Sequence, residues 1–174
     1  MGRMKRLNEL KILIIGYGRH GKDTVAEMLR DNLGMKFTSS SQACSDYFIF
    51  DRLKDRYGYS TSQECFDDRH NHRTEWFQLI QEYNSKDKTR LARNILEHNH
   101  IYVGMRCERE LEACNRAKIF DHIVWVDASK RLPPESTDSN TITEKDADYT
   151  INNNFNIEWL DFAVQRWLNK VTHK

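Results

Sequence analysis

The sequence has few of the residues that staple small folds together or anchor a chain in a membrane. Its four cysteines lie far apart and form no Cys-x-x-Cys pair, which argues against a disulfide framework and against a zinc site. No apolar run approaches the roughly 18–20 residues of a membrane-spanning helix, and no signal-peptide pattern follows the basic N-terminus. The sequence therefore predicts reduced thiols, no membrane partner and a cytoplasmic location.

The chain also lacks an excess of charge of either sign. Lys and Arg number 27 and Asp and Glu number 26, which gives a net charge of +1. Proteins that bind nucleic acids through bulk charge carry a marked basic excess, so this balance argues against a nucleic-acid partner. With 174 residues, 11% of them aromatic, we expect one domain over residues 1–174, with residues 1–10 as a basic lead-in.

Short apolar runs alternate with amphipathic stretches along the chain. Runs at 11–15, 101–103 and 123–126 are apolar on both alternating faces, which is typical of buried parallel strands, and a last strand is expected at 148–151. Helices are expected at 21–33, 45–57, 62–65, 73–83, 86–98, 108–118 and 157–171. This order predicts an α/β fold with a mostly parallel sheet. Residues 128–142 hold both prolines and predict a mobile, lid-like loop.

The segment GYGRHGKDT, residues 16–24, fits the pattern G-x-x-x-x-G-K between a buried strand and an amphipathic helix. Glycines let successive backbone N–H groups curl around a phosphate, and the helix directs its positive end to the same oxygens. The alternative is an ordinary glycine-rich turn, but the flanking elements favour phosphate binding. Lys22 favours a nucleoside triphosphate over a dinucleotide. The candidate contacts are Gly16, Gly18, Arg19, His20, Gly21, Lys22, Asp23 and Thr24.

Asp23 stands where this pattern normally has Ser or Thr. Its carboxylate could bind Mg²⁺ directly or through water, or it could cap the helix while Thr24 supplies the hydroxyl. Asp127 ends a hydrophobic strand and is another candidate metal carboxylate. The sequence leaves the choice between these acids open.

Arginines at three places point to a second anion. Arg106 follows the strand at 101–103, where ligand sites of α/β proteins gather. Arg69 and Arg73 are four residues apart and would share one face of a helix. The alternative for this pair is a solvated charged helix.

Two further positions carry a functional and an ordinary interpretation each. Trp76 extends the stripe of Arg69 and Arg73, so a nucleobase could stack on it, and the alternative places its indole in the core. Lys130 and Arg131 lie in the loop at 128–142 and could close over a transferring phosphoryl group. The alternative for them is ordinary exposed loop charge.

Five segments in order, GxxxxGKDT, DDRHNHRTEW, IYVGMR, VWVDASKRLPPE and DADYTINNN, resemble bacteriophage deoxynucleoside monophosphate kinases, within the wider P-loop nucleoside monophosphate kinase family. The resemblance covers about residues 11–155. It implies a P-loop kinase three-layer sandwich with helices on both faces of the sheet. It also implies ATP as phosphoryl donor, Mg²⁺ as cofactor, a (deoxy)nucleoside monophosphate as acceptor, and the host cytoplasm as location.

The resemblance also implies roles for individual residues. Lys22, Arg106 and Arg131 would be catalytic, and the acceptor would be bound by Ser39, Ser40, Arg69, Arg73 and Arg106. Asp68 and Trp76 are further candidate acceptor contacts, which the helical spacing predicts rather than the resemblance. The alternative for the serines at 39–41 is a polar turn that caps the next helix. The chain lacks the D-G-x-P-R acceptor motif of adenylate-kinase-like relatives, because Gly104-Met105-Arg106 keeps only its glycine and arginine. The base and the sugar of the acceptor are therefore left open.

The expected partners are small-molecule nucleotides, and the sequence leaves open whether the chain forms a homodimer. Two alternative functions remain. One is a P-loop kinase for another small phosphorylated acceptor. The other is a nucleotide-dependent switch, although the sequence has no N-K-x-D motif for reading guanine.

Overall fold

A five-stranded parallel sheet forms the centre of the computed structural model, which describes residues 6–137 and 139–172. The strand order is β2-β3-β1-β4-β5. Their bounds are β1 (Ile12–Ile15), β2 (Phe37–Ser39), β3 (Ile101–Val103), β4 (His122–Asp127) and β5 (Tyr149–Asn152). The predicted α/β class with a parallel sheet is confirmed.

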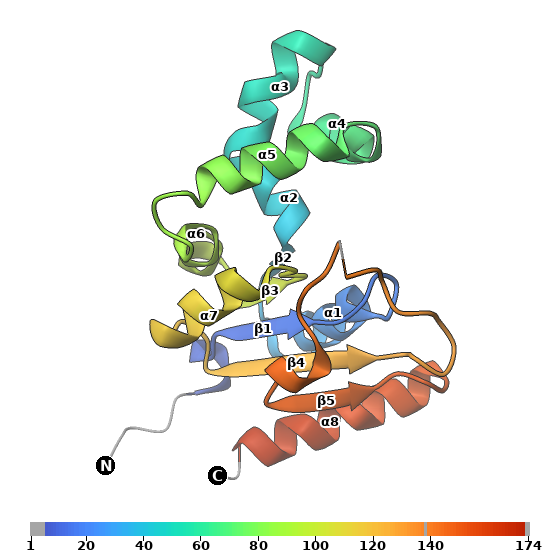
Figure 1. Cartoon of the computed structure of the whole chain (residues 1–174). Helices are drawn as coiled ribbons and strands as arrows, with labels where there is room; N and C mark the ends of the chain where they lie inside the picture. The colour runs from blue at the N-terminus through green and yellow to red at the C-terminus, as the bar shows by residue number, and fades with distance from the viewer. Residues whose placement is uncertain (1–5, 138, 173–174) are drawn as a thin grey trace.

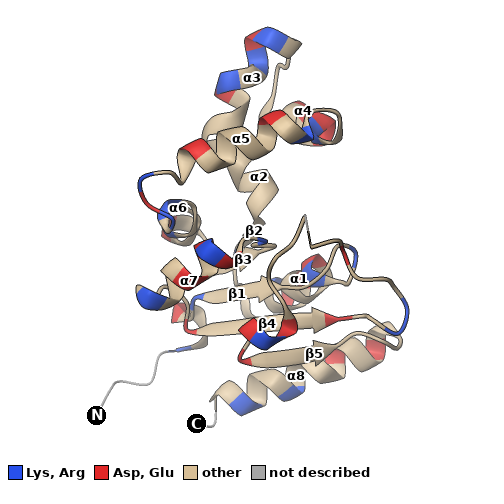
Figure 2. Ribbon diagram, viewed as in Figure 1, with Lys and Arg blue, Asp and Glu red and all other residues tan. Residues whose placement is uncertain are grey.

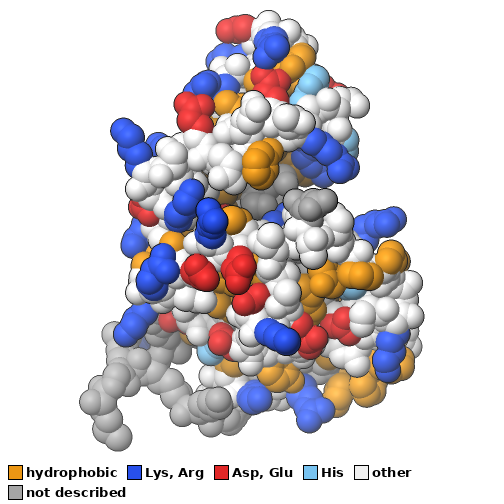
Figure 3. All heavy atoms as spheres, viewed as in Figure 1, with side chains coloured by type: hydrophobic (Ala, Val, Ile, Leu, Met, Phe, Trp, Pro, Cys, Tyr) orange, Lys and Arg blue, Asp and Glu red, His pale blue; other side chains and the backbone are white. Residues whose placement is uncertain are grey.

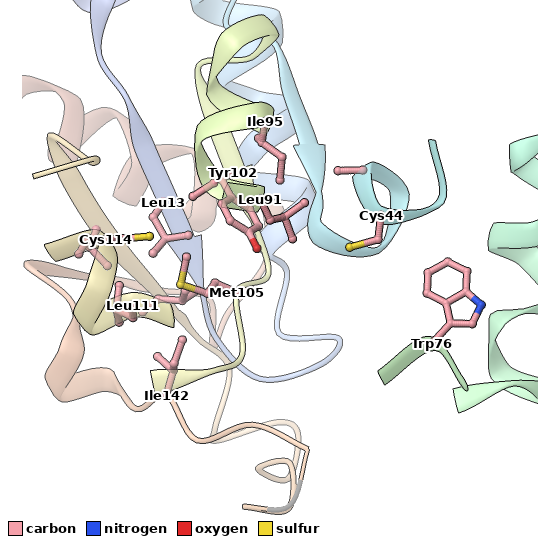
Figure 4. Close-up of a cluster of buried hydrophobic side chains, with 14 of the residues drawn as sticks. Leu13, Cys44, Trp76, Leu91, Ile95, Tyr102, Met105, Leu111, Cys114 and Ile142 are labelled. Atoms are coloured by element: carbon pink, nitrogen blue, oxygen red, sulfur yellow. The ribbon is translucent and has the colours of Figure 1, made fainter. Parts of the chain in front are cut away.

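Helices cover both faces of this sheet (Figure 1), and the central strand β1 is therefore buried on both sides. Ile12 and Ile14 face a core with α1 (Lys22–Leu33) and α8 (Ile157–Thr172). Leu13 and Ile15 face the opposite core, where α6 (Arg90–His98) and α7 (Glu108–Arg116) contribute the side chains shown in Figure 4. The result is the expected three-layer arrangement (Figure 1).

Residues 40–83 form a helical module that stands over the β2 and β3 end of the sheet (Figure 1). Its elements are α2 (Ser40–Cys44), a π-helical turn η2 (Ser45–Ile49), α3 (Phe50–Tyr57), α4 (Ser62–Asp67), a 3-10 turn η3 (Asp68–Asn71) and α5 (Arg73–Tyr83). Cys44 and Trp76 of this module belong to the same core as Leu13 (Figure 4). The module is therefore part of one folded unit with the sheet. Two further 3-10 turns are η1 (Leu7–Glu9) and η4 (Glu144–Asp146).

Several helix boundaries differ from the sequence prediction. The helix predicted from residue 86 begins only at Arg90, because Asp87 accepts hydrogen bonds from the backbone N–H and the hydroxyl of Thr89 and thereby forms a turn. The helix predicted to reach residue 118 ends at Arg116, and Lys118 has a φ of +52°. Side-chain hydrogen bonds and left-handed backbone therefore set helix ends that apolar periodicity does not reveal.

Two other sequence predictions concern cysteines and membranes. All four cysteines are free thiols, as predicted. Within the described ranges, none of the helices has both the length and the apolar character needed to cross a bilayer.

One carboxyl group lies inside the core between β3 and α7. The Glu110 side chain is 7% exposed, and it accepts a hydrogen bond of 3.1 Å from the Tyr102 hydroxyl. Burial raises the pKa of Glu110 to about 7, although the Tyr102 hydrogen bond opposes the shift. In the unfolded chain the Glu110 carboxyl ionises near pH 4.5. The free energy of unfolding of the protein therefore falls as the pH rises from about 4.5 to 7.

We expect Glu110→Gln to stabilise the protein at pH 8 by about 3 kcal/mol, because the glutamine removes a charge that costs free energy to bury. At pH 4.5 the two proteins should have nearly equal free energies of unfolding. Urea denaturation at both pH values measures the difference. A stability gain that is the same at both pH values would contradict the assignment.

Candidate phosphate-binding site

The glycine loop, residues 16–24, joins β1 to α1 and packs tightly against neighbouring backbone. A Cβ on Gly16 would lie 2.7 Å from the carbonyl oxygen of Val126 in β4. A Cβ on Gly21 would collide with the side-chain amide of Asn153, which donates a 2.9 Å hydrogen bond to the His20 carbonyl. Both glycines also have positive φ angles, of +148° and +100°. Because neither position can accept a side chain, the loop backbone packs directly against β4 and Asn153.

Lys22 points its ammonium group back into this loop. Its Nζ donates a 2.9 Å hydrogen bond to the Tyr17 carbonyl oxygen. Burial lowers the pKa of Lys22 to about 8, and the positive charge of Arg106 adds to the shift. A cation held in a loop of N–H donors is the arrangement that binds a polyphosphate.

Two residues predicted to bind the acceptor substrate lie near Lys22: Ser40, which follows β2, and Arg106, which follows β3. A Cβ on Gly104, whose φ is +89°, would lie 3.8 Å from the Ser40 hydroxyl oxygen and 3.9 Å from Lys22 Cε. Ser40 donates a 3.1 Å hydrogen bond to the Gly104 carbonyl oxygen. Gly104 turns the chain toward Arg106, so the structure brings Ser40, Lys22 and Arg106 together. Ser39 instead accepts a hydrogen bond from the Gln42 N–H, which is the capping role named as its alternative.

A residue that the sequence reasoning did not single out completes the site. Glu135, in the loop at 128–142, accepts a 2.9 Å hydrogen bond from the Gly18 N–H and a 2.5 Å hydrogen bond from Arg106 Nη1. Burial alone would raise the pKa of Glu135, but the hydrogen bond and charge of Arg106 outweigh it and lower the pKa. Only its place in the segment VWVDASKRLPPE could have drawn attention to it.

His20 and Arg131 hold the loops together rather than facing a ligand. The His20 ring is fully buried, accepts from the Ala128 N–H at Nδ1 and lies 3.2 Å from the Pro133 carbonyl oxygen at Nε2, which therefore carries the proton. Arg131, predicted to be catalytic, donates from Nε and Nη2 to the Asn153 carbonyl oxygen at 3.0 and 2.8 Å. In this structure its guanidinium group is directed to backbone beside the glycine loop.

The predicted charged stripe is divided between two elements. Arg69 lies in η3 and Arg73 begins α5, so they do not share one helix face. Arg69 donates to the Phe66 carbonyl and lies over the Phe66 ring, while Arg73 lies 3.4 Å from His70 Nδ1. These contacts stay within the helical module, and in the described part of the chain no hydrogen bond or ion pair joins either arginine to the glycine loop.

Asp68 and Trp76 also take structural positions in the module. Asp68 accepts hydrogen bonds from Tyr59 and Asn71, lies 2.9 Å from His72 Nε2, and lines a shallow cavity of about 560 Å³. Trp76 is 5% exposed, which confirms its core interpretation and leaves no face for a base to stack on. The aromatic ring that α5 exposes is the next residue, Phe77, at 63%.

Acidic groups that could bind a cation are spread around the loop. Asp23 is exposed in the first turn of α1, whereas Asp127 accepts hydrogen bonds from Asn154 Nδ2 and the Ser129 N–H. Burial would raise the pKa of Asp127, and these hydrogen bonds lower it. Residues 6–137 and 139–172 contain no group of three or more potential metal ligands. This donor set suits Mg²⁺, which usually takes one or two carboxylates and completes its shell with phosphate and water.

The surface is hollowed on one side and carries charges of both signs. Figure 3 shows a hollow between the helical module and the rest of the molecule. Lys and Arg are interspersed with Asp and Glu over the elements seen in Figure 2, rather than gathered on one face.

Comparisons with known proteins establish the fold. No family model matches the sequence, and no curated protein matches it by sequence. The crystal structure of TT1252 from Thermus thermophilus is 16% identical with a TM-score of 0.52, and the alignment covers 92% of this chain and 97% of that one. Shikimate kinase from Bacteroides thetaiotaomicron is 12% identical with a TM-score of 0.50, over 93% and 98%. The chain thus has the three-layer P-loop kinase fold that the sequence predicted.

We expect Arg106→Met to raise the pKa of Lys22 above its value of about 8, because the substitution removes a neighbouring positive charge and leaves Glu135 unpaired. The pKa should remain below 10.5, since the burial of Lys22 persists. NMR titration of the lysine ¹³Cε resonances measures both values. An unchanged Lys22 titration in the variant would contradict the described geometry.

Proposed function

We propose that the protein is an ATP-dependent kinase that transfers the γ-phosphoryl group to a (deoxy)nucleoside monophosphate and forms the diphosphate. The observation that carries this proposal is the meeting of Lys22 with Arg106 beside Ser40. A cation from the glycine loop and a cation from the end of β3 can face a donor and an acceptor phosphate from two sides. The proposed entry point of the acceptor is the hollow between the helical module and the rest of the molecule (Figure 3).

The chemistry needed is mostly positioning. The acceptor phosphate is already anionic, so little proton abstraction is required, and transfer can proceed in line without a phosphoenzyme. Loop N–H groups hold the donor phosphates, and Lys22 follows the charge of the transferring group. Arg106 neutralises charge that collects between donor and acceptor.

Asp23 and Thr24 are the residues that would hold Mg²⁺, through a carboxylate and a hydroxyl in the first turn of α1. The ion supplies charge neutralisation on the donor phosphates. The exposed position of Asp23 leaves room for water in the coordination shell.

Arg69 and Arg73 are the proposed clamp for the acceptor phosphate. Each would exchange a weak internal partner, the Phe66 carbonyl or the His70 ring, for a charge-assisted hydrogen bond. The nucleotide class of the acceptor rests on the resemblance of the five sequence segments. The fold shared with shikimate kinase supports a second candidate, a kinase for a different small acceptor.

A coupled assay of ADP formation with ATP and Mg²⁺ tests the proposal. We expect turnover to depend on one or more of the common dNMPs and NMPs, and not on shikimate. Lys22→Ala should lower kcat/KM by at least a hundredfold, because the removed charge acts mainly in the transition state. Slow ATP hydrolysis that no acceptor accelerates would contradict the proposal and favour a nucleotide switch.

The clamp is tested by Arg69→Ala and Arg73→Ala. We expect each to raise the KM of the acceptor roughly tenfold to hundredfold with little change in the KM of ATP, since each removes one charge-assisted hydrogen bond. Arg52→Ala is the matched control, because Arg52 is an exposed arginine of the same module that pairs with Glu82. Equal effects of all three variants would refute the clamp.

A further inference from the structure

Two candidate anion-binding groups of the glycine loop, and Arg106 beside it, already have partners within the protein. The Gly18 N–H and the Arg106 guanidinium both donate to the Glu135 carboxylate, and Lys22 donates to the Tyr17 carbonyl. Buried and half-buried donors rarely stay without acceptors, so such internal partners are expected wherever no ligand supplies oxygens. Of these two internal acceptors, the Glu135 carboxylate carries a full negative charge, whereas the Tyr17 carbonyl is neutral.

The Glu135 carboxylate has the contacts that a bound phosphate oxygen would have. It receives one backbone N–H from the loop and one arginine N–H, and Asn140 Nδ2 lies 3.5 Å from Oε2. A Cβ on Gly18 would lie 3.2 Å from Oε1, so the carboxylate is in close contact with the loop at Gly18. An acid seated on a phosphate-binding amide excludes phosphate from that amide.

The loop at 128–142 is fixed on both sides of Glu135. His20 holds its first half through the Ala128 N–H and the Pro133 carbonyl. Its second half returns to Arg106, whose carbonyl oxygen accepts hydrogen bonds from the N–H and hydroxyl of Thr141. The carboxylate therefore lies in a loop whose described residues on either side of it are hydrogen-bonded close to the site.

The contact is also accessible enough to be exchanged. The Glu135 side chain is 22% exposed and that of Arg106 is 46% exposed. Because both partners of this ion pair are partly exposed to solvent, an incoming polyphosphate with several negative oxygens can replace the carboxylate.

We propose that Glu135 is a positioning residue whose carboxylate competes with the donor polyphosphate for the Gly18 N–H and releases Arg106 when it is displaced. The inference rests on the proposed function only in taking the ligand to be a polyphosphate. Arg106 is held close to the loop until the donor enters and is then available to the phosphates. The Glu135 side chain thereby couples the binding of the donor to the release of the Arg106 guanidinium group.

The test measures the affinity for inorganic tripolyphosphate by calorimetry, without an acceptor. We expect the Glu135→Gln variant to bind tripolyphosphate about tenfold more tightly than the wild type. This factor corresponds to a Glu135 carboxylate that contacts the Gly18 N–H in about nine wild-type molecules of ten, so that only about one in ten is free to bind. Glu108→Gln is the matched control, because it removes the same charge two residues from Arg106 at an exposed position. An affinity gain of equal size in both variants, or none in Glu135→Gln, would overturn the proposal.

A second measurement uses the wild-type protein and does not depend on the variant's folding. The Gly18 amide proton should resonate downfield because it donates to a carboxylate, and tripolyphosphate should shift this resonance and the Glu135 carboxyl resonance together. A Glu135 resonance that stays unchanged at saturation would contradict displacement. If no acceptor supports ADP formation but Glu135→Gln still binds tripolyphosphate more tightly, the proposed kinase function fails and this inference stands.

Discussion

The close approach of the glycine loop to β4 and to the segment after β5 is the constraint on which the site depends. Gly16 lies against the Val126 carbonyl, and Gly21 lies against Asn153, at distances that exclude any side chain. Asn153 in turn holds the His20 carbonyl, and its own carbonyl receives Arg131. The loop therefore takes its shape from the neighbouring strands, and its N–H groups are oriented before any ligand arrives.

The parallel sheet explains why charged groups from distant parts of the chain meet at this loop. In a parallel sheet all strands end at the same edge, and the loops that follow them are neighbours there. β1 delivers Lys22 through the glycine loop, β3 delivers Arg106 through Gly104, and the loop after β4 delivers Glu135. Burial lowers the pKa of Lys22, and the charge of Arg106 adds to this shift. Arg106 also lowers the pKa of Glu135, against the effect of burial. The two cations and the one carboxylate leave this cluster with a net positive charge, which supports the proposed binding of phosphate groups.

Much of the sheet and of the glycine loop could be predicted from residue order, whereas the helical module could not. The runs at 101–103 and 123–126 read as buried strands because both of their faces are apolar, and they are strands with nearly the predicted bounds. The spacing of Arg69 and Arg73 suggested a shared helix face, but the chain leaves helical geometry at His72, whose φ is −128°. Trp76 shows the same limit, since helical periodicity alone left open whether its indole would stack on a base or lie in the core, where the structure places it.

The sequence by itself determined the local features of the site. These are a strand, a glycine loop of the phosphate-binding pattern and a helix in succession, with Lys22 at the helix start, and Arg106 after a second strand. These features follow from short-range patterns, because apolar alternation and glycine backbone freedom act over a few residues. Only the tertiary structure decided that Glu135 would be seated on Gly18, that Arg131 would be directed to Asn153, and that Ser40 would lie beside Lys22. These contacts join residues far apart in the chain, and their partners depend on strand order and on the path of the loop at 128–142. No residue spacing encodes that path, since it results from the packing of the whole sheet edge.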